Sequence, residues 1–146
     1  MKVQKAIEIN ATPERIWPFF IEPEKILLWY STFRKFEYAG DQHSGVGTRI
    51  YTEEQAGGPL MKVLYEATEW KEAVKLDLRM VSGSGVKSYR LIWELEAIPS
   101  GSRFTFTEEV ELPFGVIGKL IGLLGQGMSE KTVGKIQLKL KALAEA

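Results

Sequence analysis

The residue best placed to do chemistry is Glu108, a carboxylate within an otherwise apolar strand pattern. Phe104, Phe106, Val110 and Leu112 recur at every second position around it. Alternate residues of a strand share one face, so Glu108 is expected on the apolar face, where it must be paired, protonated or near water. The pattern predicts a polar anchor or acid/base group in a cavity, with its pKa raised by burial. The alternative is a strand-end carboxylate that reaches solvent, or a β-bulge that turns it outward.

Aromatic side chains accompany this carboxylate on neighbouring strands. Tyr89 and Trp93 fall on the same kind of face, as Tyr65 does in one of two possible registers. Such residues commonly form core, but they can also line a pocket and offer an OH or NH to a ligand. Trp29 ends a short helix where a pocket mouth is expected. The ligand-binding residues predicted from the sheet and short helices are Glu108, Tyr89, Trp93, Phe104, Phe106, Met80, Tyr65 and Trp29.

Other common kinds of catalytic or binding site have no support in the sequence. His43 is the only histidine and lies in a polar turn, and no G-x-S-x-G elbow is present for a serine nucleophile. The GVG at 45–47 lacks the third glycine and the βαβ context of a dinucleotide site. There is no cysteine and no metal-ligand spacing. We predict no metal and no cofactor. Whether the protein is an enzyme stays open, with Glu108 as the catalytic residue if it is.

A long C-terminal helix is predicted from Pro113 to Ala146, with two unlike halves. The second half is amphipathic and is expected to pack on the sheet. Its apolar stripe consists of Met128, Thr132, Ile136, Leu140 and Leu143. The first half is apolar nearly all round yet rich in glycine, so it is interpreted either as helix or as a partly mobile loop.

Three glycines of that first half share one helix face. Gly118, Gly122 and Gly125 lie beside the apolar residues Ile117 and Ile121. Each glycine inside a helix costs about 0.8–1 kcal/mol relative to alanine, so the strip suggests a need for room beside it. We predict that the strip faces the pocket and that Ile117, Gly118, Ile121 and Gly122 contact the ligand. The alternative is that the glycines let the helix sit tightly on the sheet.

The remaining elements form an α+β order. An N-terminal strand over 3–10 leads to Thr12-Pro13, a helix-start signal, and two short helices are expected before residue 31. Turn clusters then separate six extended stretches, which predict an antiparallel meander with one apolar face. These stretches are 33–39, 47–55, 60–70, 73–82, 86–98 and 102–112. The register of 47–55 and 60–70 stays ambiguous.

Composition limits the functional classes. With 146 residues the chain suits a single domain, 1–146, and its 45% apolar and 26% charged residues are typical of a globular protein. Nineteen basic and nineteen acidic residues cancel, which argues against nucleic acid as a partner. No apolar run reaches 18 residues and no signal-peptide pattern is present, so we predict a cytoplasmic protein without stable membrane insertion. It is expected to be a monomer or weak homodimer.

This order of elements resembles the START-like superfamily (SRPBCC, helix-grip fold), and within it the polyketide cyclase/dehydrase and lipid-transport-like proteins. The resemblance covers the whole chain. It rests on ATPERIWPFF after the first strand, EPEKILLWY, GVGTRI and EATEWKEAVKLDLRM. It implies a curved antiparallel sheet of about seven strands that grips the long helix and encloses a cavity for an apolar small molecule.

The sequence supports three functions, of which we predict the first and keep the other two as alternatives. The first is binding, transport or sensing of an apolar or amphipathic small molecule, such as a lipid or polyketide-like compound. The second is a cyclase or dehydratase acting on a polyketide-like aromatic precursor, with Glu108 as acid/base and Tyr89 or Tyr65 orienting the substrate. The third is an interaction module with a filled core and no ligand.

Overall fold

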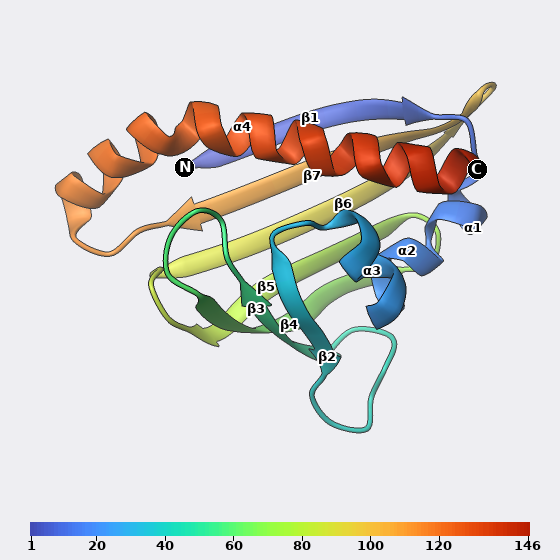
Figure 1. Ribbon diagram of the computed structural model, residues 1–146. Helices are drawn as coiled ribbons and strands as arrows, with labels where there is room; N and C mark the ends of the chain where they lie inside the picture. The colour runs from blue at the N-terminus through green and yellow to red at the C-terminus, as the bar shows by residue number, and fades with distance from the viewer.

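Seven antiparallel strands form one curved sheet that wraps around a long C-terminal helix in the computed structural model, which describes residues 1–146 (Figure 1). The strands are β1 (Lys2–Ile9), β2 (Phe33–Tyr38), β3 (Arg49–Glu54), β4 (Met61–Lys71), β5 (Lys75–Gly83), β6 (Ser88–Ile98) and β7 (Gly101–Glu111). The helices are α1 (Pro13–Ile16), α2 (Pro18–Ile21), α3 (Pro23–Trp29) and α4 (Gly115–Glu145). The sheet order is β1-β7-β6-β5-β4-β3-β2. The predicted helix-grip fold class is confirmed.

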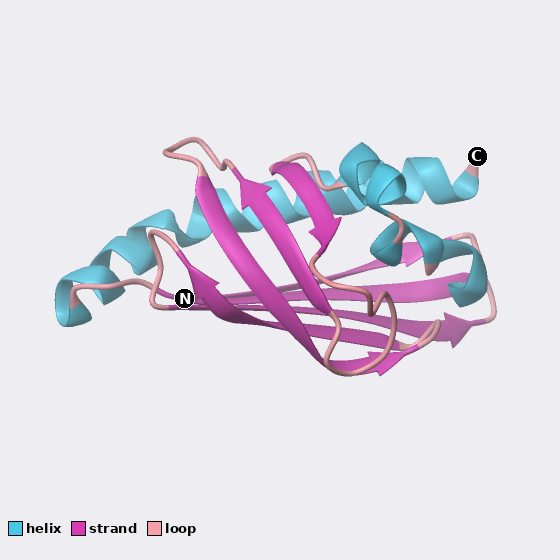
Figure 2. Cartoon of the chain, turned by 90° about the horizontal axis from the view of Figure 1, so that it is seen from below, coloured by secondary structure: helices cyan, strands magenta, loops and turns pink.

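Three prolines divide the short helical region. Thr12 caps α1 by accepting a hydrogen bond from the Arg15 amide at 3.3 Å. The first of the two predicted short helices is split into α1 and α2 at Pro18, which has no amide hydrogen to donate. The indole of Trp29 donates to the Phe19 carbonyl at 2.8 Å, which ties α3 to α2. These helices close one end of the curved sheet (Figure 2).

The structure resolves the register that the sequence left open. Ile50, Thr52 and Glu54 of β3 are buried on the concave face, whereas Arg49 is exposed. Tyr65 of β4 lies directly opposite Ile50 and is fully buried. The concave face therefore carries polar as well as apolar side chains toward α4.

The alternation of the strand residues had suggested that the convex face is uniformly solvent-exposed. The structure shows that it is not. Asp77 of β5 is only 3% exposed and accepts hydrogen bonds from Arg90 of β6 at 2.7 and 3.1 Å. This fork-shaped pairing leaves the buried carboxylate with a cation next to it. The pair joins β5 to β6 on the outer surface of the sheet, away from α4.

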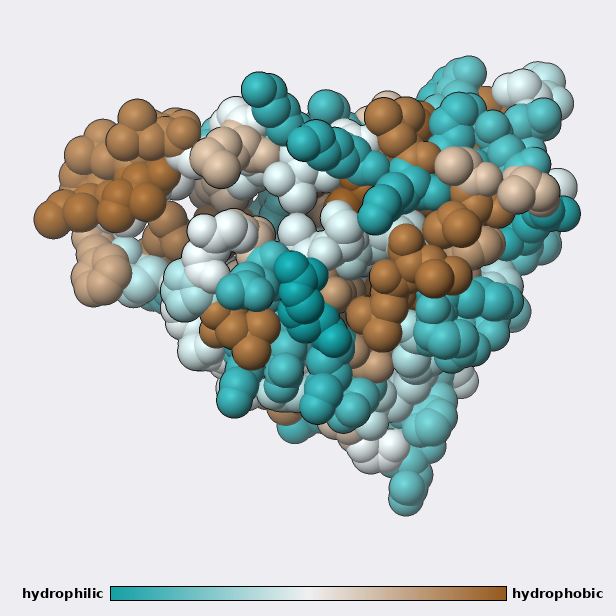
Figure 3. Space-filling view, in the orientation of Figure 1, coloured by the Kyte–Doolittle hydropathy of each residue, from teal (hydrophilic) through white to brown (hydrophobic).

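The two halves of α4 have different surroundings. In the second half, Val133, Ile136 and Leu140 are buried against the sheet, and Gln137 donates to the Lys5 carbonyl of β1 at 2.9 Å. The first half is helical and extends past the sheet, with its apolar side chains largely exposed (Figure 3). Those side chains are Val116, Ile117, Leu120, Ile121, Leu123 and Leu124. No helix has an apolar stretch long enough to cross a membrane.

Candidate ligand-binding site

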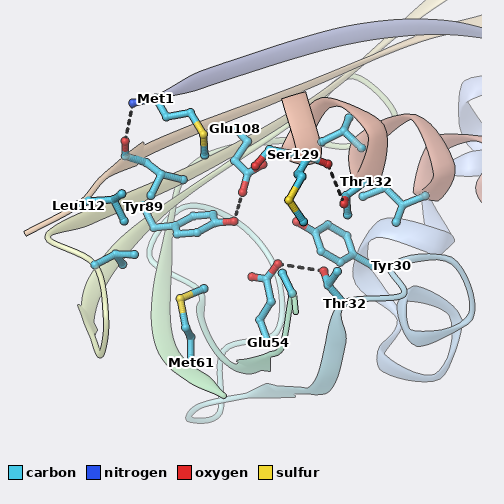
Figure 4. A pocket seen from close by; sticks show the side chains of 16 residues that line it. Met1, Tyr30, Thr32, Glu54, Met61, Tyr89, Glu108, Leu112, Ser129 and Thr132 are labelled. Carbon is cyan, nitrogen blue, oxygen red and sulfur yellow. Dashed lines mark hydrogen bonds between the residues drawn. The ribbon is translucent and has the colours of Figure 1, made fainter. Parts of the chain in front are cut away.

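A pocket of about 200 Å³ lies between the concave sheet face and the middle of α4 (Figure 4). Eleven of its sixteen lining residues are hydrophobic. The lining consists of Met1, Tyr30, Thr32, Glu54, Ala56, Met61, Val86, Tyr89, Glu108, Val110, Leu112, Met128, Ser129, Thr132, Val133 and Ile136. An apolar cavity with a few convergent polar groups is the usual form of a small-molecule site.

Glu108 reaches this pocket because of its register in β7. It lies opposite Leu91 of β6 and Val3 of β1, both of which are buried on the concave face. The Tyr89 hydroxyl donates a hydrogen bond to its carboxylate. Burial raises the pKa of Glu108 above its ordinary value, while the hydrogen bond from Tyr89 opposes that rise.

Glu54 is a second carboxylate in the same pocket, contributed by the last residue of β3. It is 4% exposed, and Thr32 donates to its Oε1 at 2.9 Å. Its Oε2 is buried and has no hydrogen-bond partner. Burial and the nearby charge of Glu108 raise the pKa of Glu54 to about 7, although the Thr32 hydrogen bond lowers it.

Three tyrosines surround the two carboxylates. Burial raises the pKa of Tyr30, Tyr65 and Tyr89 well above the ordinary value, and the charges of Glu54 and Glu108 add to this effect. All three therefore remain neutral near pH 7. The Tyr65 hydroxyl is buried without a hydrogen-bond partner, behind the pocket lining. Tyr30 and Tyr89 line the pocket, so the site offers hydroxyl groups as well as carboxylates to a polar atom of a ligand.

The pocket opens toward the surface between α4 and the loop after β3. A neighbouring surface hollow shares Thr32, Ala56, Met128 and Thr132 with it. Ala56 and Met128 are exposed, and Met128 is 72% exposed. Ala56 and Met128 therefore lie at the border between the pocket and the outer hollow.

The structure brings together only some of the residues expected from the sequence. Glu108 and Tyr89 line the pocket. The other predicted sheet and short-helix residues lie outside its lining: Trp93, Phe104, Phe106, Tyr65 and Trp29 are fully buried core, and Met80 is half-buried on β5. Phe20 packs against Trp93 and Phe104, with ring centroids 5.3 and 5.2 Å apart. Most of the predicted aromatic residues thus belong to the hydrophobic core and do not line the pocket.

The residues predicted in the first half of α4 also lie outside this pocket. Ile117 and Ile121 are 64% and 52% exposed, so they face solvent. A Cβ added at Gly118 would lie 2.2 Å from the Pro113 carbonyl oxygen, and one at Gly122 would lie 3.5 Å from Met1 Cβ. Gly118 therefore lets the helix pass close to the preceding turn, whereas Gly125 has open space beside it. Gly118 and Gly122 border a separate, more polar hollow, and the pocket begins farther along, at Met128.

Glu54 and the α4 lining were missed as site residues. One of the two possible registers of the 47–55 stretch places Thr48, Ile50 and Thr52 on one face, and Glu54 follows at the same spacing. That alternation was the one available signal for Glu54. Met128, Thr132 and Ile136 were expected only to pack on the sheet. No cluster of three or more His, Cys, Asp or Glu side chains is placed to hold a metal ion.

Comparisons with known proteins agree with this fold. Solved structures with the same fold include protein TTHA0849 from Thermus thermophilus, at a TM-score of 0.81 and 21% identity, covering 99% of this chain and 97% of that one. A Streptomyces aromatase/cyclase has a TM-score of 0.80 at 10% identity, covering 99% and 93% of the two chains. Major latex-like protein 151 from Panax ginseng has a TM-score of 0.74 at 12% identity, covering 100% and 98%.

The family comparison covers the chain from end to end. No curated protein matches the sequence. The model of one family, described as polyketide cyclase/dehydrase and lipid transport, matches residues 1–146. The chain therefore belongs to the polyketide cyclase/dehydrase and lipid-transport family.

Proposed function

We propose that this protein binds an apolar or amphipathic small molecule in the pocket between the sheet and α4. The observation that carries this proposal is the cavity itself, which opens to the surface and has a mostly hydrophobic lining. A domain with a completely filled core would have no such space, so the interaction-module alternative is weaker.

The size of the cavity limits the ligand. Its volume of about 200 Å³ is below the roughly 300–1,000 Å³ typical of ligand sites. The pocket in this conformation suits a compact ligand. A long-chain lipid would require α4 to move outward, or part of its acyl chain to extend out of the pocket opening. Binding of a compact ligand, followed by its release for transport or sensing, is the role we favour.

A fluorescence titration with the neutral apolar dye N-phenyl-1-naphthylamine tests the proposal. Binding should saturate at ~1:1 stoichiometry and raise the melting temperature, because a ligand that binds only the folded state stabilises it. Ser129→Trp should weaken dye binding about tenfold or more, since Ser129 lines the pocket and a larger side chain would fill it. Leu138→Trp is the matched control, because Leu138 is 59% exposed on α4 outside the pocket. Non-saturating dye uptake without a thermal shift would reject the proposal.

One observation favours a second candidate, a cyclase or dehydratase. Dehydration needs one group to remove a proton and another to protonate the departing hydroxyl, and both groups work best with a pKa near the operating pH. Glu54, with a pKa of about 7, and Glu108 share the pocket. Mass spectrometry of a β-hydroxyketone incubated with the protein separates the two functions. A binding protein leaves the mass of this compound unchanged, whereas a dehydratase converts it to a product that has lost water. Glu108→Gln and Glu54→Gln should then abolish turnover.

A further inference from the structure

The two pocket carboxylates differ from the other buried acid because they have no cationic partner. Buried Asp77 is paired with Arg90 at 2.7 Å. Neither Glu54 nor Glu108 takes part in an ion pair, and the one cation in the pocket lining, the Met1 amino group, donates to the Val110 carbonyl at 2.8 Å. An unpaired buried carboxylate is costly, and two that face one cavity repel each other.

We propose that the ligand carries a protonated amine, which binds between Glu54 and Glu108 while its apolar body fills the rest of the pocket. This inference rests on the proposed binding function and specifies the ligand class. An ammonium group supplies the missing positive charge, and a primary ammonium has three hydrogen atoms to donate.

The free acceptor atoms match this requirement. Glu54 Oε2 is buried and has no partner, although its residue lines the cavity. Glu108 receives one hydrogen bond, from Tyr89 to its Oε1, which leaves its other oxygen available. Both carboxylates point toward the middle of the pocket (Figure 4). An amine there can donate to one oxygen of each residue.

The rest of the lining suits the carbon skeleton of such a ligand. Met61, Val86 and Val110 present apolar surface beside the carboxylates, and Val133 and Ile136 do so from α4. A neutral alcohol would satisfy an acceptor without offsetting the negative charge. A fatty acid would place a third carboxylate beside the first two, which like-charge repulsion disfavours.

The pH dependence follows from the groups that face Glu54. These are Glu108 from β7, Tyr65 from β4, Tyr89 from β6 and Tyr30 after α3, while α4 contributes only uncharged lining residues. The Met1 amino group donates to the Val110 carbonyl at 2.8 Å, and Lys135 and Arg34 border the outer hollow. Because Glu54 must be ionised to hold an ammonium, amine affinity should rise about tenfold between pH 6 and pH 8.

Calorimetric titrations with hexylamine, hexanol and hexanoate test the inference on the intact protein. The three probes share a chain that suits the cavity and differ only in the polar end, and an alkylamine stays protonated over this pH range. At pH 8 hexylamine should bind at least about tenfold more tightly than hexanol, a difference of about 1.4 kcal/mol, and hexanoate should bind most weakly. Hexylamine affinity should rise from pH 6 to pH 8, while that of hexanol stays nearly constant.

Matched variants test whether the two carboxylates cause the preference for hexylamine. Glu54→Gln should weaken hexylamine binding about tenfold, remove most of its pH dependence and leave hexanol binding within about threefold. Glu108→Gln should weaken amine binding similarly. Glu53→Gln is the control, because Glu53 is the neighbouring residue of β3, accepts a hydrogen bond from Tyr51 at 2.7 Å and lies outside the pocket.

Two kinds of failure can be told apart. If the neutral dye binds but hexylamine binds no more tightly than hexanol or hexanoate, or none of the three binds, the amine inference is overturned and the proposed function stands. If the dye also fails to bind, both are overturned. An unchanged amine affinity in both glutamine variants, with the folded state verified by circular dichroism, would likewise overturn the inference.

Discussion

The Tyr89 hydroxyl donates a hydrogen bond to the Glu108 carboxylate between the adjacent strands β6 and β7. The two residues are not directly opposed, since Tyr89 pairs with Val110 and Glu108 with Leu91. The bond therefore runs diagonally over the concave face and fixes one carboxylate oxygen within the pocket. Glu108 is positioned by the sheet, which makes it a stable feature of the site.

Removal of this hydroxyl should raise the pKa of Glu108 further. Burial raises that pKa and the Tyr89 hydrogen bond lowers it, so Tyr89→Phe leaves the burial effect unopposed. Carbon-13 NMR titration of the side-chain carboxyl should show a wild-type midpoint above the usual ~4.3 and a still higher one in Tyr89→Phe. A wild-type midpoint at or below 4.3 would show that Glu108 is exposed or ion-paired, and the acid/base role would lose its basis.

Glu54 should make the protein less stable as the pH rises. Its pKa is raised from 4.5 to about 7 on folding, so the folded state holds the proton more tightly than the unfolded state. The resulting stabilisation is complete below pH 4.5 and is lost as the pH rises to about 7, on the order of 3 kcal/mol in all. Glu54→Gln should remove this part of the pH dependence.

Urea unfolding of wild type and Glu54→Gln from pH 5 to pH 8 measures the effect. As the pH rises, the free energy of unfolding of the wild type should fall relative to that of Glu54→Gln. Glu53→Gln serves as the control and should follow the wild type. A difference that stays constant over this range would show that Glu54 titrates at its ordinary pKa.

The sequence predicted the fold more fully than the site. Strand alternation and turn clusters are local signals in the sequence. Together with the family resemblance, they were sufficient to predict seven strands and a long helix. The same alternation placed Glu108 correctly on the concave face. Glu54 was missed because β3 has polar residues in both phases, and only its pairing with β4, where Ile50 lies opposite Tyr65, decides which phase is buried.

The position of the pocket along α4 could not be predicted from the helix sequence. Glycines at helical spacing show that something approaches closely or that space is needed, but they do not identify the neighbour. For Gly118 the neighbour is the Pro113 carbonyl, within the turn that precedes the helix. The apolar first half suggested a buried surface, yet the helix passes the end of the sheet before it reaches Met128.

The glycines of α4 should respond to alanine with opposite signs. A Cβ at Gly122 would make ordinary contacts with Met1 at 3.5 Å and Leu112 at 3.9 Å, so Gly122→Ala should stabilise the protein by about 0.8–1 kcal/mol through helix propensity. Gly118→Ala should destabilise it, because its Cβ would lie 2.2 Å from a backbone oxygen. Gly125→Ala, with open space around it, is the control and should resemble Gly122→Ala. Thermal unfolding measures all three, and equal effects at Gly118 and Gly122 would contradict the packing described here.

The ion pair on the convex face should affect stability without affecting ligand binding. Asp77→Ala removes the buried partner of Arg90, whose side chain is 27% exposed and keeps only Glu109 at 3.4 Å. We expect a loss of about 2–3 kcal/mol in the free energy of unfolding, because Arg90 remains partly solvated. Dye affinity should stay at the wild-type value at a temperature where the variant is folded. A large loss of affinity would show that the convex face is coupled to the pocket.

Methionine methyl NMR tests the central claim most directly, because three of the four methionines line the pocket. Met1, Met61 and Met128 are in the lining, whereas Met80 is half-buried on β5 outside it. In protein labelled with carbon-13 at the methionine methyl groups, N-phenyl-1-naphthylamine should shift the resonances of Met1, Met61 and Met128 with one common saturation curve. The Met80 resonance should move much less. If Met80 shifts as much as the other three, or if the signals of Met61 and Met128 do not move while the dye binds, the ligand does not occupy this pocket.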